Sequence, residues 1–198
     1  DLIYLKQIKN KNHQISFSGK FSKNISKINT ITILLRLLDQ KQLLGKKKFE
    51  IKVIKNIPQR AGMGGGSMNA ATLINFFIRK KIIKIKKKEL IELTRIVGSD
   101  VILGINPKNV ILSSNGKIKK YDKKMKIHTL VVKPNFGCST KHIYSKVRKF
   151  TKSKFNNPKQ SMLRMDYLKN LNNALEMIAF KKYPKLKKIK SFLLTIPN

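Results

Sequence analysis

The sequence contains few acidic residues, one cysteine and no tryptophan. Only 9 of its 198 residues are Asp or Glu, against 45 Lys or Arg, so the formal net charge is +36. The single cysteine, Cys138, excludes a disulfide framework within the chain and suits a reducing compartment. No apolar run approaches the roughly 20 residues of a membrane-spanning helix, and the first residues do not resemble a signal peptide, so we expect a cytoplasmic protein.

Arginine is also scarce, which weakens the most obvious interpretation of the charge. A strongly basic small chain first suggests a nucleic-acid partner. Base and phosphate readout favours arginine and interleaved aromatic residues, yet the arginines are only Arg36, Arg60, Arg79, Arg95, Arg148 and Arg164. The lysines are spread along the chain beside abundant Ile and Asn, whose codons are also A/T-rich. A basic nucleic-acid-binding protein therefore stays open only as the alternative from another functional class, and it predicts salt-sensitive binding to DNA or RNA.

Hydrophobic periodicity predicts strands and helices in mixed order, and 41% hydrophobic residues suit one globular domain or most of one. The first two strands read as a hairpin, Gly98 as a left-handed helix C-cap, and Asn115-Gly116 as a second hairpin turn. Mixed order with hairpins favours an α+β fold. We expect strands at 2–8, 14–18, 49–54, 110–112, 117–121 and 130–133, and helices at 26–38, 68–80, 88–97, 141–150 and 168–181.

The most informative stretch is residues 57–73, where four glycines occupy five positions between a strand and a helix. Such a loop can bring backbone amides against phosphate oxygens while the positive end of the next helix faces the same point. Ser67 would cap that helix and offer its hydroxyl to a metal or a phosphate. The Rossmann and Walker patterns both fail, because Ser67 and Met68 stand where they need Gly or Lys. The alternative is a turn that merely packs a strand closely against a helix.

The order Pro-x-x-x-Gly-x-Gly-Gly-Gly-Ser-x-Asn-Ala-Ala, starting at Pro58, resembles the second motif of the GHMP kinases. The triple glycine and Asn69 favour the 4-diphosphocytidyl-2-C-methyl-D-erythritol kinase family among them. Homoserine kinase, or another GHMP kinase, is the alternative within the same fold. Further segments are similar to that family in order and spacing: residues 1–3, 24–25, 98–101, 115–117, 134–144 and 173–184.

The resemblance implies an α+β GHMP kinase fold with two domains. The N-terminal, ATP-binding domain, ribosomal protein S5 domain 2-like, would cover residues 1–125. The start of a ferredoxin-like C-terminal domain would cover residues 126–198. Two segments of the family have no counterpart here: an N-terminal strand with a Lys-x-Asn pair and Tyr-His, and a C-terminal glycine-rich motif. We therefore expect a chain truncated at both ends, inactive or unstable alone.

The resemblance also implies a reaction and its residues. ATP, with Mg²⁺, would phosphorylate the 2-hydroxyl of 4-diphosphocytidyl-2-C-methyl-D-erythritol in non-mevalonate isoprenoid synthesis, and Asp100 would be the catalytic aspartate. Asp100 also fits an ordinary helix N-cap. Thr140 and Tyr144 would bind substrate, with Tyr144 stacking on its cytosine, and Ser67 would contact Mg²⁺. The residues expected to bind ATP are Asn24, Lys55, Pro58, Gly62, Gly64, Gly65, Gly66, Ser67 and Asn69. We expect no membrane partner, and the sequence predicts no oligomeric state.

Overall fold

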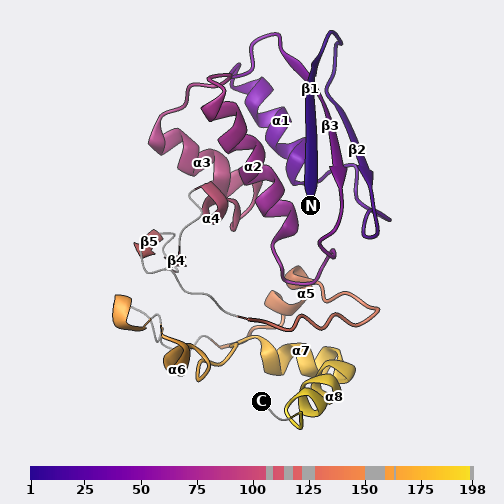
Figure 1. Ribbon diagram of the computed structural model, residues 1–198, viewed down its shortest axis with the longest axis vertical. Coiled ribbons are helices and arrows are strands. Elements are labelled where there is room, and N and C mark those ends of the chain that lie inside the picture. The colour runs from indigo at the N-terminus through magenta and orange to yellow at the C-terminus, as the bar shows by residue number, and fades with distance from the viewer. Residues whose placement is uncertain (106–108, 114–117, 122–127, 150–158, 163, 197–198) are drawn as a thin grey trace. The chain divides into compact units, whose positions relative to one another are not determined.

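The computed structural model describes residues 1–105, 109–113, 118–121, 128–149, 159–162 and 164–196 (Figure 1). The chain divides into two compact units. The first contains residues 1–59 and 63–107, and the second contains residues 60–62 and 108–198. The predicted domain boundary at residue 125 stays a prediction. No helix in the ranges given above is long and apolar enough to cross a membrane.

The first unit is built on a three-stranded sheet of β1 (Leu2–Ile8), β2 (Gln14–Ser18) and β3 (Lys48–Ile54). The order is β1-β3-β2, with β3 antiparallel to β1 and parallel to β2. The predicted hairpin of the first two strands is therefore wrong, because β3 lies between them. Its alternate side chains Phe49, Ile51 and Val53 are all buried, which favours the central position. The connection at residues 9–13 spans the roughly 10 Å between outer strands.

Helices cover one face of this sheet (Figure 1): α1 (Thr30–Gln40), α2 (Gly65–Arg79), α3 (Lys87–Val97) and the short α4 (Val101–Ile105). Their apolar stripes recur at helical spacing, as the sequence predicts. Together with β3 they form one core. Its fully buried large side chains are Ile31, Leu34, Leu35, Leu38, Leu44, Phe49, Ile51, Val53, Leu73, Ile74, Phe77 and Leu93.

The ends of these helices differ from the prediction at three places. Helix α1 begins at Thr30 rather than residue 26, because Asn29 and Thr32 form a capping box that starts it there. Helix α2 begins at Gly65, with left-handed Gly64 as its N-cap, so Ser67 lies inside the first turn and does not cap it. Gly98 does end α3, but its φ of 168° is extended rather than left-handed. At the start of α1, local hydrogen bonds rather than the apolar stripe set the boundary.

In the second unit, β4 (Asn109–Leu112) and β5 (Ile118–Tyr121) pair antiparallel, as predicted, and their turn at Asn115-Gly116 lies outside the described residues. No strand forms at 130–133, where Leu130 is 79% exposed. Without a neighbouring strand or core, apolar residues alone do not make a strand. The helical elements are α5 (Thr140–Tyr144), η1 (Gln160–Met162), α6 (Met165–Leu168), α7 (Glu176–Lys182) and α8 (Pro184–Leu193).

The two helices predicted in this unit are shorter than expected. The predicted helix at 141–150 ends at Tyr144, where the Ser145 hydroxyl donates to the carbonyl of His142 at 2.8 Å. The predicted helix at 168–181 is interrupted, because the Asn173 side chain accepts from the amide of Leu175 at 3.0 Å. Ser and Asn side chains that bond nearby backbone groups compete with helix formation.

Candidate functional site

The glycine-rich segment joins β3 to the start of α2, and two of its glycines have distinct steric reasons. Gly64 has a φ of 66°, a left-handed conformation that favours glycine. A Cβ on Gly65 would lie 2.9 Å from Cγ2 of Ile57, so a side chain there would push the helix off the loop. No side chain caps α2, and the first amides of a helix have no acceptor inside it. The amides of Gly65, Gly66 and Ser67 are thus available to an anion.

Two other segments lie against this first turn of α2. The Thr30 hydroxyl, at the start of α1, donates to the carbonyl of Gly66 at 2.8 Å. A Cβ on Gly98 would lie 3.7 Å from the Ser67 hydroxyl oxygen, so the chain after α3 passes beside Ser67. These contacts fix the start of α2 from both sides, and they place the half-buried Ser67 hydroxyl beside the segment that carries Asp100.

Asp100 comes immediately before α4 and its side chain is exposed. Its Oδ1 accepts from the Ser99 hydroxyl at 3.1 Å, and its carbonyl accepts from the amide of Leu103 at 3.1 Å. The chain on both sides of Asp100 packs on α2, because Gly98 approaches Ser67 and Gly104 approaches Ala71. The structure therefore brings Asp100 beside the first turns of α2, with its carboxylate open to a ligand.

Gly104 makes this packing possible, and no local sequence pattern indicates its role. A Cβ there would lie 2.6 Å from the Cβ of Ala71, closer than side chains can come. One turn further along α2, the Asn75 side-chain amide donates to the Gly104 carbonyl at 2.9 Å. Close approach and hydrogen bond together hold α4 against α2 and so fix the position of Asp100.

Asp1 is a further residue that the sequence-based prediction missed. Its side chain is fully buried, and it forms an ion pair with Lys55. Its Oδ1 accepts from the amides of Asn56 and Ile57 at 2.9 and 2.8 Å, and its Oδ2 accepts from the Asn69 side chain at 2.7 Å. One carboxylate thus joins the end of β3, the loop that follows it and the first turns of α2.

The Asp1 network occupies two side chains that were expected to bind ATP. Lys55 and Asn69 are both buried, and both use polar atoms on Asp1. Burial lowers the pKa of Lys55, while its pairing with Asp1 provides the counter-charge that a buried ammonium requires. Their geometry makes them supports of the glycine-rich loop; their direct contact with a nucleotide stays a prediction.

Asn24 and Pro58 lie on two segments that the Gln59 side chain connects. The Gln59 side chain donates to the carbonyls of Phe21 and Lys23 at 2.7 and 2.8 Å. Asn24 follows directly, exposed and with a φ of 61°, a conformation that asparagine tolerates. Gln59 thereby joins the half-buried Pro58 turn to the Asn24 turn, an arrangement that no local pattern indicates.

Three of the predicted site residues belong to the second unit. Gly62 has a φ of 71° and is exposed, and the Tyr144 side chain is 60% exposed at the end of α5. Thr140 starts α5, but its side chain lies outside the described part of the chain. In the same unit the amide of Cys138 donates to the carbonyl of Arg60 at 3.1 Å, and burial raises the pKa of the Cys138 thiol. Among the described residues, no three His, Cys, Asp or Glu side chains gather as a metal site.

Comparisons with known proteins show the family to which this chain is similar. Residues 29–116 match the family described as the GHMP kinases N terminal domain. A 4-diphosphocytidyl-2-C-methyl-D-erythritol kinase of Pelagibacter ubique is 62% identical over 198 residues, which cover all of this chain and 70% of that protein. Enzymes of the same name from Petrotoga mobilis and Clostridium botulinum are 34% and 37% identical, over 72% and 71% of this chain.

A solved structure titled as a crystal structure of 4-(cytidine 5'-diphospho)-2C-methyl-D-erythritol kinase shares the fold. Its TM-score is 0.61 at 20% identity, over 96% of this chain and 67% of that one. The matches span 58% and 53% of the Petrotoga and Clostridium enzymes, so this chain corresponds to part of its relatives' length. Identity of 62% along the whole chain, with the GHMP domain match, shows that the chain belongs to the 4-diphosphocytidyl-2-C-methyl-D-erythritol kinase family of GHMP kinases.

Proposed function

We propose that this chain carries out ATP-dependent phosphorylation of the 2-hydroxyl of 4-diphosphocytidyl-2-C-methyl-D-erythritol, as part of an enzyme of non-mevalonate isoprenoid synthesis. The observation that carries the proposal is the 62% identity, over all 198 residues, to a relative with that name. The available amides at the start of α2 and the exposed carboxylate of Asp100 beside them support it. The single cysteine suits a reducing compartment such as the cytoplasm, which we propose as its location.

The start of α2 is suited to hold the phosphates of the nucleotide. Phosphoryl transfer depends mainly on positioning and on neutralising charge at the transferred group. Backbone amides of Gly65, Gly66 and Ser67 supply donors, and the helix dipole adds positive potential at the same point. The steric limits at Gly64 and Gly65 keep side chains away from this surface. The loop thus binds phosphate through its backbone, without depending on a particular lysine.

Asp100 is the group that accepts the proton of the attacking hydroxyl. As the 2-hydroxyl oxygen forms a bond to the γ-phosphorus, the bond from that phosphorus to the β–γ bridging oxygen breaks, and ADP leaves with the electron pair. The hydroxyl proton passes to the Asp100 carboxylate. The Ser99 hydroxyl donates to Oδ1 at 3.1 Å and orients the carboxylate to accept this proton.

The residues at this site fit a magnesium ion that is held mainly by phosphates and water. Mg²⁺ prefers oxygen ligands and often takes few from the protein, and the half-buried hydroxyl of Ser67 would supply one such oxygen. Bound there, Mg²⁺ would neutralise charge on the phosphates. On the substrate side, Thr140 would bind polar groups, and the exposed ring of Tyr144 would stack on the cytosine.

A segment exchange tests this function. In the Pelagibacter relative, the segment that aligns with this chain is replaced by this chain, so that the remaining 30% of that protein completes the enzyme. We expect ADP to form with 4-diphosphocytidyl-2-C-methyl-D-erythritol and not with homoserine. The matched control is the unmodified Pelagibacter protein. A folded chimera that binds ATP but forms no ADP with this substrate would contradict the proposal, and ADP formed only with homoserine would assign the chain to another GHMP activity.

A further inference from the structure

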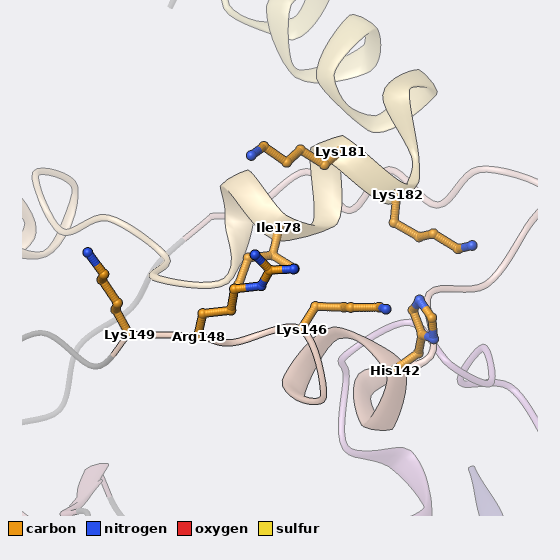
Figure 2. A pocket seen from close by; sticks show the side chains of 7 residues that line it. All are labelled: His142, Lys146, Arg148, Lys149, Ile178, Lys181 and Lys182. Atoms are coloured by element: carbon orange, nitrogen blue, oxygen red, sulfur yellow. The ribbon is translucent and has the colours of Figure 1, made fainter.

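The second unit contains a basic pocket, formed by residues 142–149 after the start of α5 and by α7 (Figure 2). Its volume is about 740 Å³, within the range of pockets that hold nucleotide-sized ligands. The lining residues are His142, Lys146, Arg148, Lys149, Ile178, Lys181 and Lys182. Five of these seven are cations at neutral pH, and none is a carboxylate.

These cations have no counter-ion in the part of the unit that the structure describes. Its described carboxylates are Asp166 and Glu176, and both are already paired. Asp166 contacts Arg164 at 2.6 Å, and Glu176 contacts Lys190 of α8 at 2.6 Å. Like charges that face one pocket repel each other, and an anion that enters it removes this repulsion and gains charge-assisted hydrogen bonds. The five cations are exposed to solvent, and the pocket presents only positive charge to an entering ligand, which favours an anion.

The positive groups follow the length of the pocket rather than meeting at one point (Figure 2). Lys146 extends toward His142, and Lys182 comes from α7 on the same side. Lys149 lies at the other end, and Lys181 extends from α7 between the two ends. Several separated cations match a linear anion with charge along its length better than a single phosphate.

This pocket is separate from the substrate residues of the proposed function. His142 and Tyr144 are two positions apart on α5, so their side chains leave that helix in directions roughly 200° apart. His142 lines the pocket, whereas Tyr144 does not. The pocket also draws on α7, which contributes no residue to the predicted ATP or substrate contacts.

We propose that this pocket is an accessory binding site for a linear polyphosphate group, such as inorganic triphosphate or the triphosphate of a nucleotide. The arginine and the lysines bind the phosphate oxygens, and Ile178 supplies an apolar wall. The site uses no residue of the glycine-rich loop at α2.

The test is a titration of the whole chain with inorganic triphosphate, at about 150 mM salt so that weak surface attraction is screened. In proton NMR of the histidine rings, the His142 resonance reports on the pocket, because His142 lines it whereas His13 and His128 do not. The His142→Gln variant assigns the signal. We expect the His142 resonance to move and saturate while that of His13 stays in place. If the His142 resonance of the unmodified chain does not move as triphosphate is added in large excess, the proposal is overturned.

Matched variants then locate the cations. Lys146→Gln with Lys182→Gln removes two pocket charges, and Lys185→Gln with Lys188→Gln removes two exposed charges from α8 that do not line the pocket. We expect the first pair to raise the triphosphate Kd at the pocket about tenfold and the second pair to leave it nearly unchanged. Equal effects would show attraction to net charge alone and overturn the proposal.

Competing ligands distinguish the sources of the anion. ATP should displace triphosphate from the pocket if the phosphate chain alone is recognised, and AMP should do so only weakly. Stronger displacement by AMP than by triphosphate would contradict the recognition of a linear polyphosphate. If a short single-stranded RNA moved the His142 resonance at lower concentration than triphosphate, the pocket would be a nucleic-acid contact instead, which would also overturn the proposal.

Discussion

Asp1 is the residue on which the glycine-rich loop of the first unit most depends, through its side-chain carboxylate. This carboxylate joins Lys55, Asn69 and the amides of Asn56 and Ile57, and it is fully buried. Asp1→Asn keeps the shape of the side chain but leaves the buried Lys55 ammonium without its counter-charge. Because removing one partner of a buried ion pair is costly, we expect a loss of about 3 kcal/mol in the free energy of unfolding, measured by urea titration.

Glu50→Gln is the control for this variant. Glu50 pairs with Lys52 at 3.1 Å, but the Lys52 side chain is 60% exposed. Solvent screens such a pair, so we expect a change below about 1 kcal/mol. If the Asp1 and Glu50 variants lost the same free energy, the Asp1 network would not support the loop.

Cys138 gives a prediction about pH. Burial raises the pKa of its thiol, so the folded chain holds less thiolate at a given pH than the unfolded chain. Because the thiolate is the nucleophile, we expect iodoacetamide to modify the folded chain several times more slowly than the urea-unfolded chain near pH 8. The difference should shrink as the pH rises through the folded pKa. This cysteine is the only one in the sequence, so total labelling measures it directly. Faster labelling of the folded chain would contradict the pKa shift.

For single residues, roles within local motifs could be predicted from the sequence, but contacts between residues far apart in the chain could not. The glycine-rich loop could be predicted from its composition, because glycine loses more backbone entropy on folding than other residues and so needs a geometric reason. Asp1 looked like the ordinary start of a strand, because the groups it binds lie more than 50 residues away in the chain. Only the fold reveals that Lys55 and Asn69 face this carboxylate.

The contact between α2 and α4 determines where Asp100 lies. Gly104→Ala adds a Cβ that would stand 2.6 Å from the Cβ of Ala71, so α4 must shift. We expect this variant to lose about 1 to 3 kcal/mol of unfolding free energy. It should also weaken turnover of the chimera, because Asp100 moves with α4.

A second change tests this explanation. Ala71→Gly removes the atom that Gly104→Ala meets, so the double variant should recover part of the stability that the two single variants lose together. A double-mutant cycle of urea unfolding measures the recovery as an interaction free energy. If the two single losses of unfolding free energy simply added in the double variant, the contact with Ala71 would not be the reason why residue 104 must be glycine.

Elements within the first unit could be predicted from periodicity, because each has one apolar face against a common core. The pairing of strands could not, since the choice of central strand depends on the whole sheet. In the second unit the same pattern failed at 130–133, where Val131 and Val132 are 60% and 46% exposed. Apolar residues predict a strand only where a neighbouring strand or a core receives them.

The whole molecule carries a net charge of +36, and most of its lysines take no part in the candidate site. Self-repulsion of this charge destabilises the compact state, and salt screens it. We therefore expect the thermal midpoint of the chain, followed by circular dichroism, to rise as NaCl increases from about 20 to 300 mM. An equal osmolality of sucrose controls for general exclusion effects. A midpoint that falls with salt would show that favourable ion pairs outweigh the repulsion.

The central claim is that Asp100 accepts the proton of the attacking hydroxyl beside the phosphate-binding start of α2. Asp100→Asn in the segment-exchange chimera tests this claim most directly. The matched control is Glu92→Gln, which makes the same change from carboxylate to amide at an exposed position on α3. We predict that the Asp100 variant binds ATP within about twofold of the parent while ADP formation falls about a thousandfold. The Glu92 variant should keep both. Unchanged turnover in the Asp100 variant would contradict the account.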